Sequence, residues 1–209
     1  MFFITFRLAG SLPAEAVERL REDREKELRN VENVAQDKIL SYKIHKRYFA
    51  KFDELLDGKT QGPMCLDDDR IAKVVAEALH YWDGKRYLLL CYCIMPNHVH
   101  LAIDVGQLSK LSFGQFNDVS QFNNLSYVLS QILHSIKRHT AREANKILQR
   151  SGAFWQHESY DHVVRDGDEL ERIVAYMLNN PEKAGLVKAW RQWKWTYIYR
   201  EMFGEEFDN

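Results

Sequence analysis

Along the first third of the chain, the spacing of apolar and polar residues predicts one strand followed by helices. Residues 2–8 (FFITFRL) alternate and are rich in β-forming side chains, so we expect a first strand there. Residues 11–30 carry Pro13 near their start and charge pairs spaced four apart, which predicts a helix. The helical pattern continues over 31–57, and another amphipathic helix is expected over 70–82.

The middle of the chain predicts two strands and a long helix. Residues 86–94 form an apolar run, and 95–97 (MPN) break it because proline cannot donate to a strand ladder. Residues 98–104 (HVHLAID) are expected to return as the antiparallel neighbour. Residues 105–124 are polar and rich in Gly, Ser and Asn, which predicts a long loop, and a helix should follow over 125–150.

The last part predicts a strand over 153–164, a helix over 168–180 that Pro181 ends, and an aromatic tail over 190–200 that is partly strand. The resulting order, strand, helices, two strands, helix, strand and helix, matches the βαββαβ pattern of α+β domains. We therefore expect a ferredoxin-like antiparallel sheet flanked by helices, which pack on one of its faces.

We predict a single domain over residues 1–209, with a helical insertion at about 14–60, after the first strand. Apolar residues make up 45% of the sequence and aromatic residues 12%, which is ample for a packed core.

Lys and Arg total 29 against 30 for Asp and Glu, so any nucleic-acid surface must arise from local clustering. The longest apolar run, 88–95, is too short to span a bilayer. The odd count of three cysteines favours reduced thiols in a cytoplasmic protein with no membrane partner.

Two histidines open the predicted strand over 98–104. Alternate residues of a strand point to the same face, so His98 and His100 should project side by side as a chelate of two imidazoles. Imidazole suits Zn, Mn, Fe and related divalent ions. The alternative is a pair of partly buried histidines that are hydrogen-bonded within the sheet.

A second chelate is available close by in the sequence. Cys91, Cys93, His98 and His100 form the spacing C-x-C-x4-H-x-H, which suggests a tetrahedral zinc site. The spacing fits common structural zinc sites poorly, and two thiols packed as small apolar groups explain the cysteines better.

The predicted helix over 168–180 carries a tyrosine away from its apolar stripe. Tyr176 and Asn180 are four residues apart, so both side chains share one face. A divalent ion held by His98, His100 and the amide oxygen of Asn180 would then lie one helical turn from the hydroxyl of Tyr176. A tyrosine oxygen can attack phosphorus to give a covalent phosphotyrosine, and a metal can polarise the phosphoryl oxygen. The alternative is a surface tyrosine on an amphipathic helix.

Positive charge gathers on the predicted long helix, at His134, Lys137, Arg138 and Arg142. Such a cluster can neutralise phosphates. The tail over 188–200 interleaves cations with aromatic residues that could stack on unpaired bases. The alternatives are a solvated helix face and aromatic residues that belong to the core.

Taken in order, three motifs resemble the HUH-class single-strand DNA transposases, above all the REP-associated tyrosine transposases. The motifs are YCIMPNHVHLAI (92–103), WQHESYDHVVR (155–165) and YMLNNPEKAGLV (176–187). The resemblance extends over most of the chain. It implies a ferredoxin-like catalytic domain that nicks single-stranded DNA at hairpins and leaves a 5′-phosphotyrosine and a free 3′-hydroxyl.

By this likeness His98 and His100 match the two metal-binding histidines, Asn180 the third ligand and Tyr176 the nucleophile. The resemblance implies Mg²⁺ or Mn²⁺ as cofactor, hairpin DNA as partner, and a monomer or a homodimer. Glu182 and the long segment 105–124 depart from the family pattern, and neither touches the expected catalytic groups. The departure at 105–124 bears on which substrate is selected. Two other functions stay open: a module that binds structured nucleic acid without cutting it, and a hydrolase in which metal-bound water attacks.

Overall fold

The fold is built around one antiparallel sheet, as the sequence predicts. The computed structural model describes residues 1–30, 38–58, 62–106 and 119–203. Its five strands lie in the order β4-β1-β3-β2-β5, and every neighbouring pair is antiparallel. The strands are β1 (Phe2–Leu8), β2 (Leu88–Ile94), β3 (His98–Asp104), β4 (Trp155–Val163) and β5 (Thr196–Ile198). The first four have the strand order of a ferredoxin-like domain, so the predicted fold class is confirmed.

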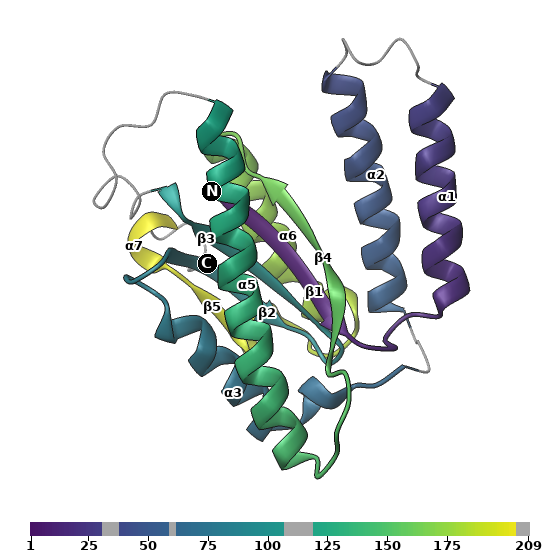
Figure 1. Ribbon diagram of the computed structural model, residues 1–209. Helices are drawn as coiled ribbons and strands as arrows, with labels where there is room; N and C mark the ends of the chain where they lie inside the picture. The colour runs from purple at the N-terminus through teal and green to yellow at the C-terminus, as the bar shows by residue number, and fades with distance from the viewer. Residues whose placement is uncertain (31–37, 59–61, 107–118, 204–209) are drawn as a thin grey trace.

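Six α-helices are described, and they cover both faces of the sheet, not one (Figure 1). They are α1 (Ala14–Asn30), α2 (Lys38–Asp57), α3 (Asp69–Tyr81), α5 (Val119–Ile147), α6 (Gly167–Lys183) and α7 (Arg200–Phe203). Two short 3₁₀ segments, Cys65–Asp67 and Trp190–Gln192, complete the description.

The alternation of side chains along the strands explains why both faces need helices. Phe2, Ile4 and Phe6 of β1 join a core cluster with α3 and α5. Phe3 points the other way and packs with Ala102 and with the apolar side of α6. Because both faces carry large buried side chains, helices on only one face would leave apolar surface in water.

Helix α6 continues past the point at which the sequence predicts its end. Pro181 lies inside the helix, which runs to Lys183. Proline lacks one N–H, but in the last turn this removes only one helical bond, and the amide of Ala184 bonds the carbonyl of Asn180 at 2.9 Å. Gly185 follows the helix end with a left-handed φ of 70°, so that Leu186 N–H reaches the carbonyl of Pro181.

The predicted loop over 105–124 is partly wrong. Helix α5 begins at Val119, so the end of that segment is helical, and 107–118 lie outside the described residues. The expected insertion after β1 is present as the helices α1 and α2, which lie side by side as a hairpin (Figure 1). Its middle, 31–37, is likewise not described. All described strands join one sheet, and a single domain over 1–209 stays a prediction.

None of the helices in the described ranges is long and apolar enough to cross a membrane. Cys65, Cys91 and Cys93 are free thiols. The aromatic tail forms the short edge strand β5, as predicted, with its register opposite Cys91, Tyr92 and Cys93 of β2.

Candidate active site

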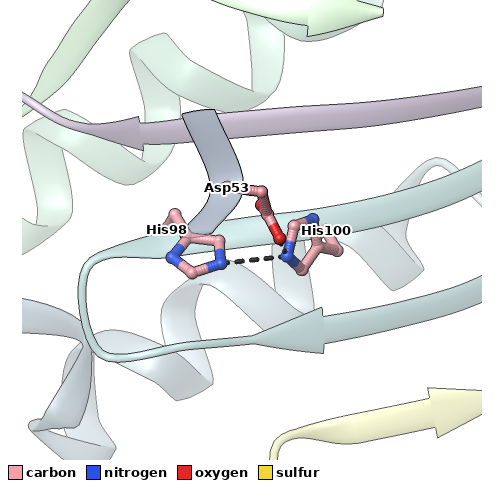
Figure 2. Close-up of side chains that lie close together, drawn as sticks. All are labelled: Asp53, His98 and His100. Atoms are coloured by element: carbon pink, nitrogen blue, oxygen red, sulfur yellow. Dashed lines mark hydrogen bonds and ion pairs between the residues drawn. The ribbon is translucent and has the colours of Figure 1, made fainter. Parts of the chain in front are cut away.

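Strand β3 places both histidines on the face that α6 covers. His98 and His100 are fully buried, at 0% exposure, and lie opposite Arg7 and Thr5 of β1. The intervening Val99 points to the other face and joins the core with α3 and α5. The predicted side-by-side arrangement of the two imidazoles is therefore confirmed (Figure 2).

A chain of hydrogen bonds fixes the tautomer of His98. Asn97 donates its side-chain N–H to the carbonyl of Leu56 at 3.0 Å, so its amide oxygen faces His98 Nδ1 at 2.7 Å. An oxygen there can only accept, and Nδ1 must therefore carry the hydrogen. Nε2 of His98 is left with a bare lone pair.

The two imidazoles direct their Nε2 atoms at one another. The Nε2 atoms of His98 and His100 are 2.9 Å apart, and Nδ1 of His100 lies 2.8 Å from the hydroxyl of Thr5. Two nitrogens that bind one ion at about 2.1 Å lie about 3.0 Å apart at right angles and about 3.4 Å apart at the tetrahedral angle. A separation of 2.9 Å therefore lets both nitrogens bind one ion after a small adjustment.

Asp53 of α2 contributes a carboxylate to the same point (Figure 2). Its Oδ1 lies 3.4 Å from Nε2 of His100, and its side chain is 1% exposed. Donor atoms of Asp53, His98 and His100 all lie within 4.8 Å of one another. One carboxylate and two imidazoles form a donor set that suits a divalent cation, so these residues fit a metal centre.

The cysteines do not belong to this cluster. Cys93 contacts Met95 and Thr196 through its sulfur, and Cys91 packs in the apolar cluster with Phe3 and Leu90. Within the described ranges, the cluster that can hold a metal contains neither thiol. The alternative zinc site is thus not formed.

Helix α6 brings Tyr176 and Asn180 to the histidines. Asn180 is 1% exposed, and its side-chain amide nitrogen lies 2.6 Å from Nε2 of His100. The oxygen and nitrogen of an amide are distinguished only by their hydrogen-bond partners, so rotation of this group by 180° places an oxygen at the same point. Tyr176 lies one helical turn before Asn180. The centroid of its ring is 5.7 Å from that of the His100 ring.

The hydroxyl of Tyr176 differs from those of the structural tyrosines. It is buried, and no residue in the described part of the chain hydrogen-bonds to it. In contrast, the buried hydroxyl of Tyr87 donates to the carbonyl of Leu79. A buried hydroxyl without a protein partner lowers the stability of the fold, so a purely structural role does not explain it. The hydroxyl of Tyr176 is instead available for binding or chemistry.

Burial keeps both imidazoles neutral. It lowers the pKa of His98 to about 3. The pKa of His100 lies well below its ordinary value, first because of burial and then because of nearby His98 and Lys183. A neutral imidazole is the form that binds metal, so both side chains are ready as ligands at neutral pH.

The predicted phosphate contacts lie on α5, across the sheet from the histidines. His134, Arg138 and Arg142 are exposed, and Arg142 is paired with Glu143 at 2.8 Å. Lys137 differs, because its ammonium donates to the carbonyls of Gln156 and His157 and to other acceptors of β4. Burial lowers the pKa of Lys137 to about 8. In this structure its bonds fasten α5 to β4.

Sequence reasoning missed Asp53, Thr5 and Asn97. Asp53 lies four residues after Phe49 on the buried side of α2, and the sequence signal for it is an acid embedded in an apolar stripe. The partners of the imidazoles, Thr5 and Asn97, come from sheet register and from a turn, which no local pattern reveals.

Comparisons with known proteins agree with the resemblance. No protein-family model matches the chain. A protein of Haemophilus influenzae (strain ATCC 51907 / DSM 11121 / KW20 / Rd), provisionally named a REP-associated tyrosine transposase, is 26% identical over 115 residues. The match covers 54% of this chain and 60% of that protein, so it spans less than two thirds of the relative.

A solved structure shares the fold. It is that of a REP-associated tyrosine transposase bound to a REP hairpin, with a TM-score of 0.51 and 13% identity. The likeness covers 97% of this chain and 79% of the other. The chain is thus similar to REP-associated tyrosine transposases in sequence over about half its length and in fold over nearly all of it.

The buried histidines should make the metal-free protein sensitive to acid. Unfolded histidine titrates near pH 6.5, whereas burial lowers the pKa of His98 to about 3. Between these values the unfolded chain binds the additional proton, so the free energy of unfolding should fall as the pH drops below about 6.5. The slope should be about 1.4 kcal/mol per pH unit for each such histidine.

Urea unfolding in a chelator, at a series of pH values from about 7 down to about 5, measures this slope. The variant His98→Gln lacks one of the titrating groups. Its slope should therefore be smaller by about 1.4 kcal/mol per pH unit, the contribution of one proton. The control His139→Gln removes an exposed histidine and should keep the wild-type slope. Equal slopes for His98→Gln and the wild type would contradict the assignment.

Proposed function

We propose that this protein is a metal-dependent single-strand DNA endonuclease and strand transferase that acts on REP-like hairpin DNA through a covalent bond to Tyr176. The observation that carries the proposal is the convergence of a partnerless phenol with the Asp53, His98 and His100 cluster on one face of the sheet. The similarity to REP-associated tyrosine transposases supports the same class of reaction.

His98, His100 and Asn180 are the proposed metal ligands, and Asp53 is a fourth. Mg²⁺ or Mn²⁺ is the proposed ion, because the resemblance to REP-associated tyrosine transposases implies it and the donor set suits a divalent cation. When bound, the ion supplies charge stabilisation to a phosphoryl oxygen and orients it. Thr5 and Asn97 hold the imidazoles in the required orientation, the usual role of the groups behind metal ligands.

Tyr176 is the proposed nucleophile. Its phenolic oxygen forms a bond to the phosphorus as the bond from phosphorus to the 3′ oxygen of the preceding nucleotide breaks. The phenol loses one proton and the departing 3′ oxygen gains one, so the products are a 5′-phosphotyrosine and a free 3′-hydroxyl. The reverse attack by a 3′-hydroxyl rejoins a strand without ATP, because the phosphotyrosine keeps the energy of the phosphodiester.

Hairpin DNA is the proposed partner. The structural neighbour is a transposase bound to a REP hairpin, and His134, Arg138 and Arg142 of α5 offer exposed cationic groups. Lys137 belongs to the same proposed surface, where it positions β4 as well as adding charge. Since Tyr176 and the histidines meet within one chain, a monomer can carry the complete site.

Cleavage should leave the protein attached to DNA. A labelled single-stranded oligonucleotide that carries a REP-type hairpin, incubated with protein and Mn²⁺, should give a shifted covalent band on a denaturing gel. Tyr176→Phe should abolish the band, because it removes the attacking oxygen while keeping the ring and its packing. The control Tyr127→Phe changes an exposed tyrosine of α5 and should leave the band unchanged.

The alternatives give different results in the same gel. A metal-bound water as nucleophile would release cleaved DNA without an adduct and would survive Tyr176→Phe. A module that only binds would retard the DNA on a native gel and yield no product. Either result, or an adduct that persists in Tyr176→Phe, would overturn the proposal.

Metal binding should depend on Asp53. A calorimetric titration of the protein with Mn²⁺ should show one binding site. Asp53→Asn should lower the affinity of this site for Mn²⁺ by about tenfold or more, because a buried anionic ligand is lost. His100→Ala should abolish the site. The control Asp23→Asn removes an exposed carboxylate of α1 and should bind as the wild type does. Unchanged affinity in Asp53→Asn would remove Asp53 from the ligand set.

A further inference from the structure

A cavity of about 230 Å³ lies beside Tyr176, between α2, β4 and α6. Its wall includes Tyr176 itself and is mostly apolar, with Phe3, Phe49 and Tyr160 as the aromatic members. It is smaller than the pockets of about 300–1,000 Å³ that hold drug-sized molecules. The cavity therefore suits a small planar group such as one nucleobase.

The aromatic rings form a rigid platform. Phe49 of α2 stacks on Tyr160 of β4 with ring centroids 4.0 Å apart and planes at 25°. Phe3 meets Phe49 edge to face at 5.3 Å, and Tyr176 completes the group at 6.4 Å from Phe49. Flat aromatic walls of this kind stack on unpaired nucleobases in proteins that bind single strands.

The charges around the cavity favour an anion. Lys46, Arg172 and Lys183 line it, against the single carboxylate of Glu169. That carboxylate is already engaged, because it accepts from the backbone N–H of Arg165 at 2.9 Å and lies 3.2 Å from His162 Nε2. Lys46 and Arg172 therefore offer cationic groups for a phosphate.

We propose that this cavity binds the base of the unpaired nucleotide on the 3′ side of the cleaved bond. This is the nucleotide whose 5′ phosphate becomes bonded to Tyr176. The inference rests on the proposed function and deepens it by assigning a binding site to one nucleotide of the substrate. Because Tyr176 forms part of the wall, a base stacked against Phe49 keeps its own 5′ phosphate close to the nucleophile. A paired base is covered by its neighbours in a duplex, so the cavity selects an unpaired one.

The proposal is tested with a fluorescent nucleotide, 2-aminopurine 2′-deoxyriboside 5′-monophosphate, added to the protein in Mg²⁺. Stacking on the aromatic platform should quench the fluorescence, and the titration gives an affinity. Phe49→Leu keeps an apolar side chain but removes the ring, and it should weaken binding roughly 5- to 100-fold. Arg172→Ala removes an exposed cation and should also weaken binding, and the control Lys73→Ala on α3, across the sheet, should not.

The 3′-monophosphate isomer distinguishes the two sides of the break. It places its phosphate away from Tyr176 and should bind more weakly than the 5′ isomer. Equal affinity for the two isomers, or affinity unaffected by both Phe49→Leu and Arg172→Ala, would overturn the proposal. Melting temperatures of the variants show that they are folded, and Arg172→Ala keeps the test valid if Phe49→Leu is unstable.

The adduct gel separates this proposal from the proposed function. If the wild type forms the covalent band but does not quench the nucleotide, the nuclease stands and the nucleotide site is wrong. If the nucleotide binds with the predicted dependence on Phe49 and Arg172 but no adduct forms, the cavity is a nucleotide site and Tyr176 is not the nucleophile.

Discussion

The interaction on which the site depends is the contact between two buried imidazoles, whose Nε2 atoms lie 2.9 Å apart. Asn97 fixes the hydrogen of His98 on Nδ1, so Nε2 of His98 faces Nε2 of His100 at 2.9 Å with its lone pair. Without an ion, a neutral His100 can donate its Nε2–H to that lone pair, and burial keeps both imidazoles neutral, with the pKa of His98 lowered to about 3. Asp53 adds a carboxylate at the same point, which favours positive charge there. Neutral imidazoles beside a carboxylate form a donor set that suits a divalent cation, which would take the place of that hydrogen.

The helical insertion completes this site and also closes it. Helix α2 supplies Asp53 to the cluster and Phe49 and Lys46 to the adjoining cavity. His98, His100 and Asn180 are at most 1% exposed, so a strand cannot lie directly on the imidazoles in this arrangement. Tyr176 lies between the cluster and the cavity. Its ring centroid is 5.7 Å from that of His100 in the cluster and 6.4 Å from that of Phe49 in the cavity wall. In the proposed function, the cavity is therefore the route by which a phosphate reaches the phenol.

Short-range geometry could be predicted from the sequence, and long-range partners could not. The i, i+2 rule placed His98 and His100 on one face, and the i, i+4 rule placed Tyr176 beside Asn180, because both rules depend only on backbone geometry. Asp53 lies 45 residues before His98, and only tertiary packing brings its helix across the sheet. The sequence pattern predicts the end of α6 too early. A proline in the last turn removes only one hydrogen bond, and the turn at Gly185 still caps the helix. The contact of Lys137 with β4 could not be predicted either, because the sequence does not reveal which carbonyls lie beside its ammonium.

The fold by itself would leave the function open, because ferredoxin-like sheets carry many activities. A neighbour at 13% identity establishes only that fold, and the relative at 26% identity aligns with about half the chain. What narrows the function is that three separate elements, α2, β3 and α6, each direct polar side chains into one apolar interior. Burying Asp53, His98 and Asn180 together requires that these groups bond one another or a ligand, and without an ion they meet around His100. In the proposed function, a metal-dependent phosphoryl-transfer site gives this buried donor set a role, which binding of DNA on the exposed face of α5 alone would not use.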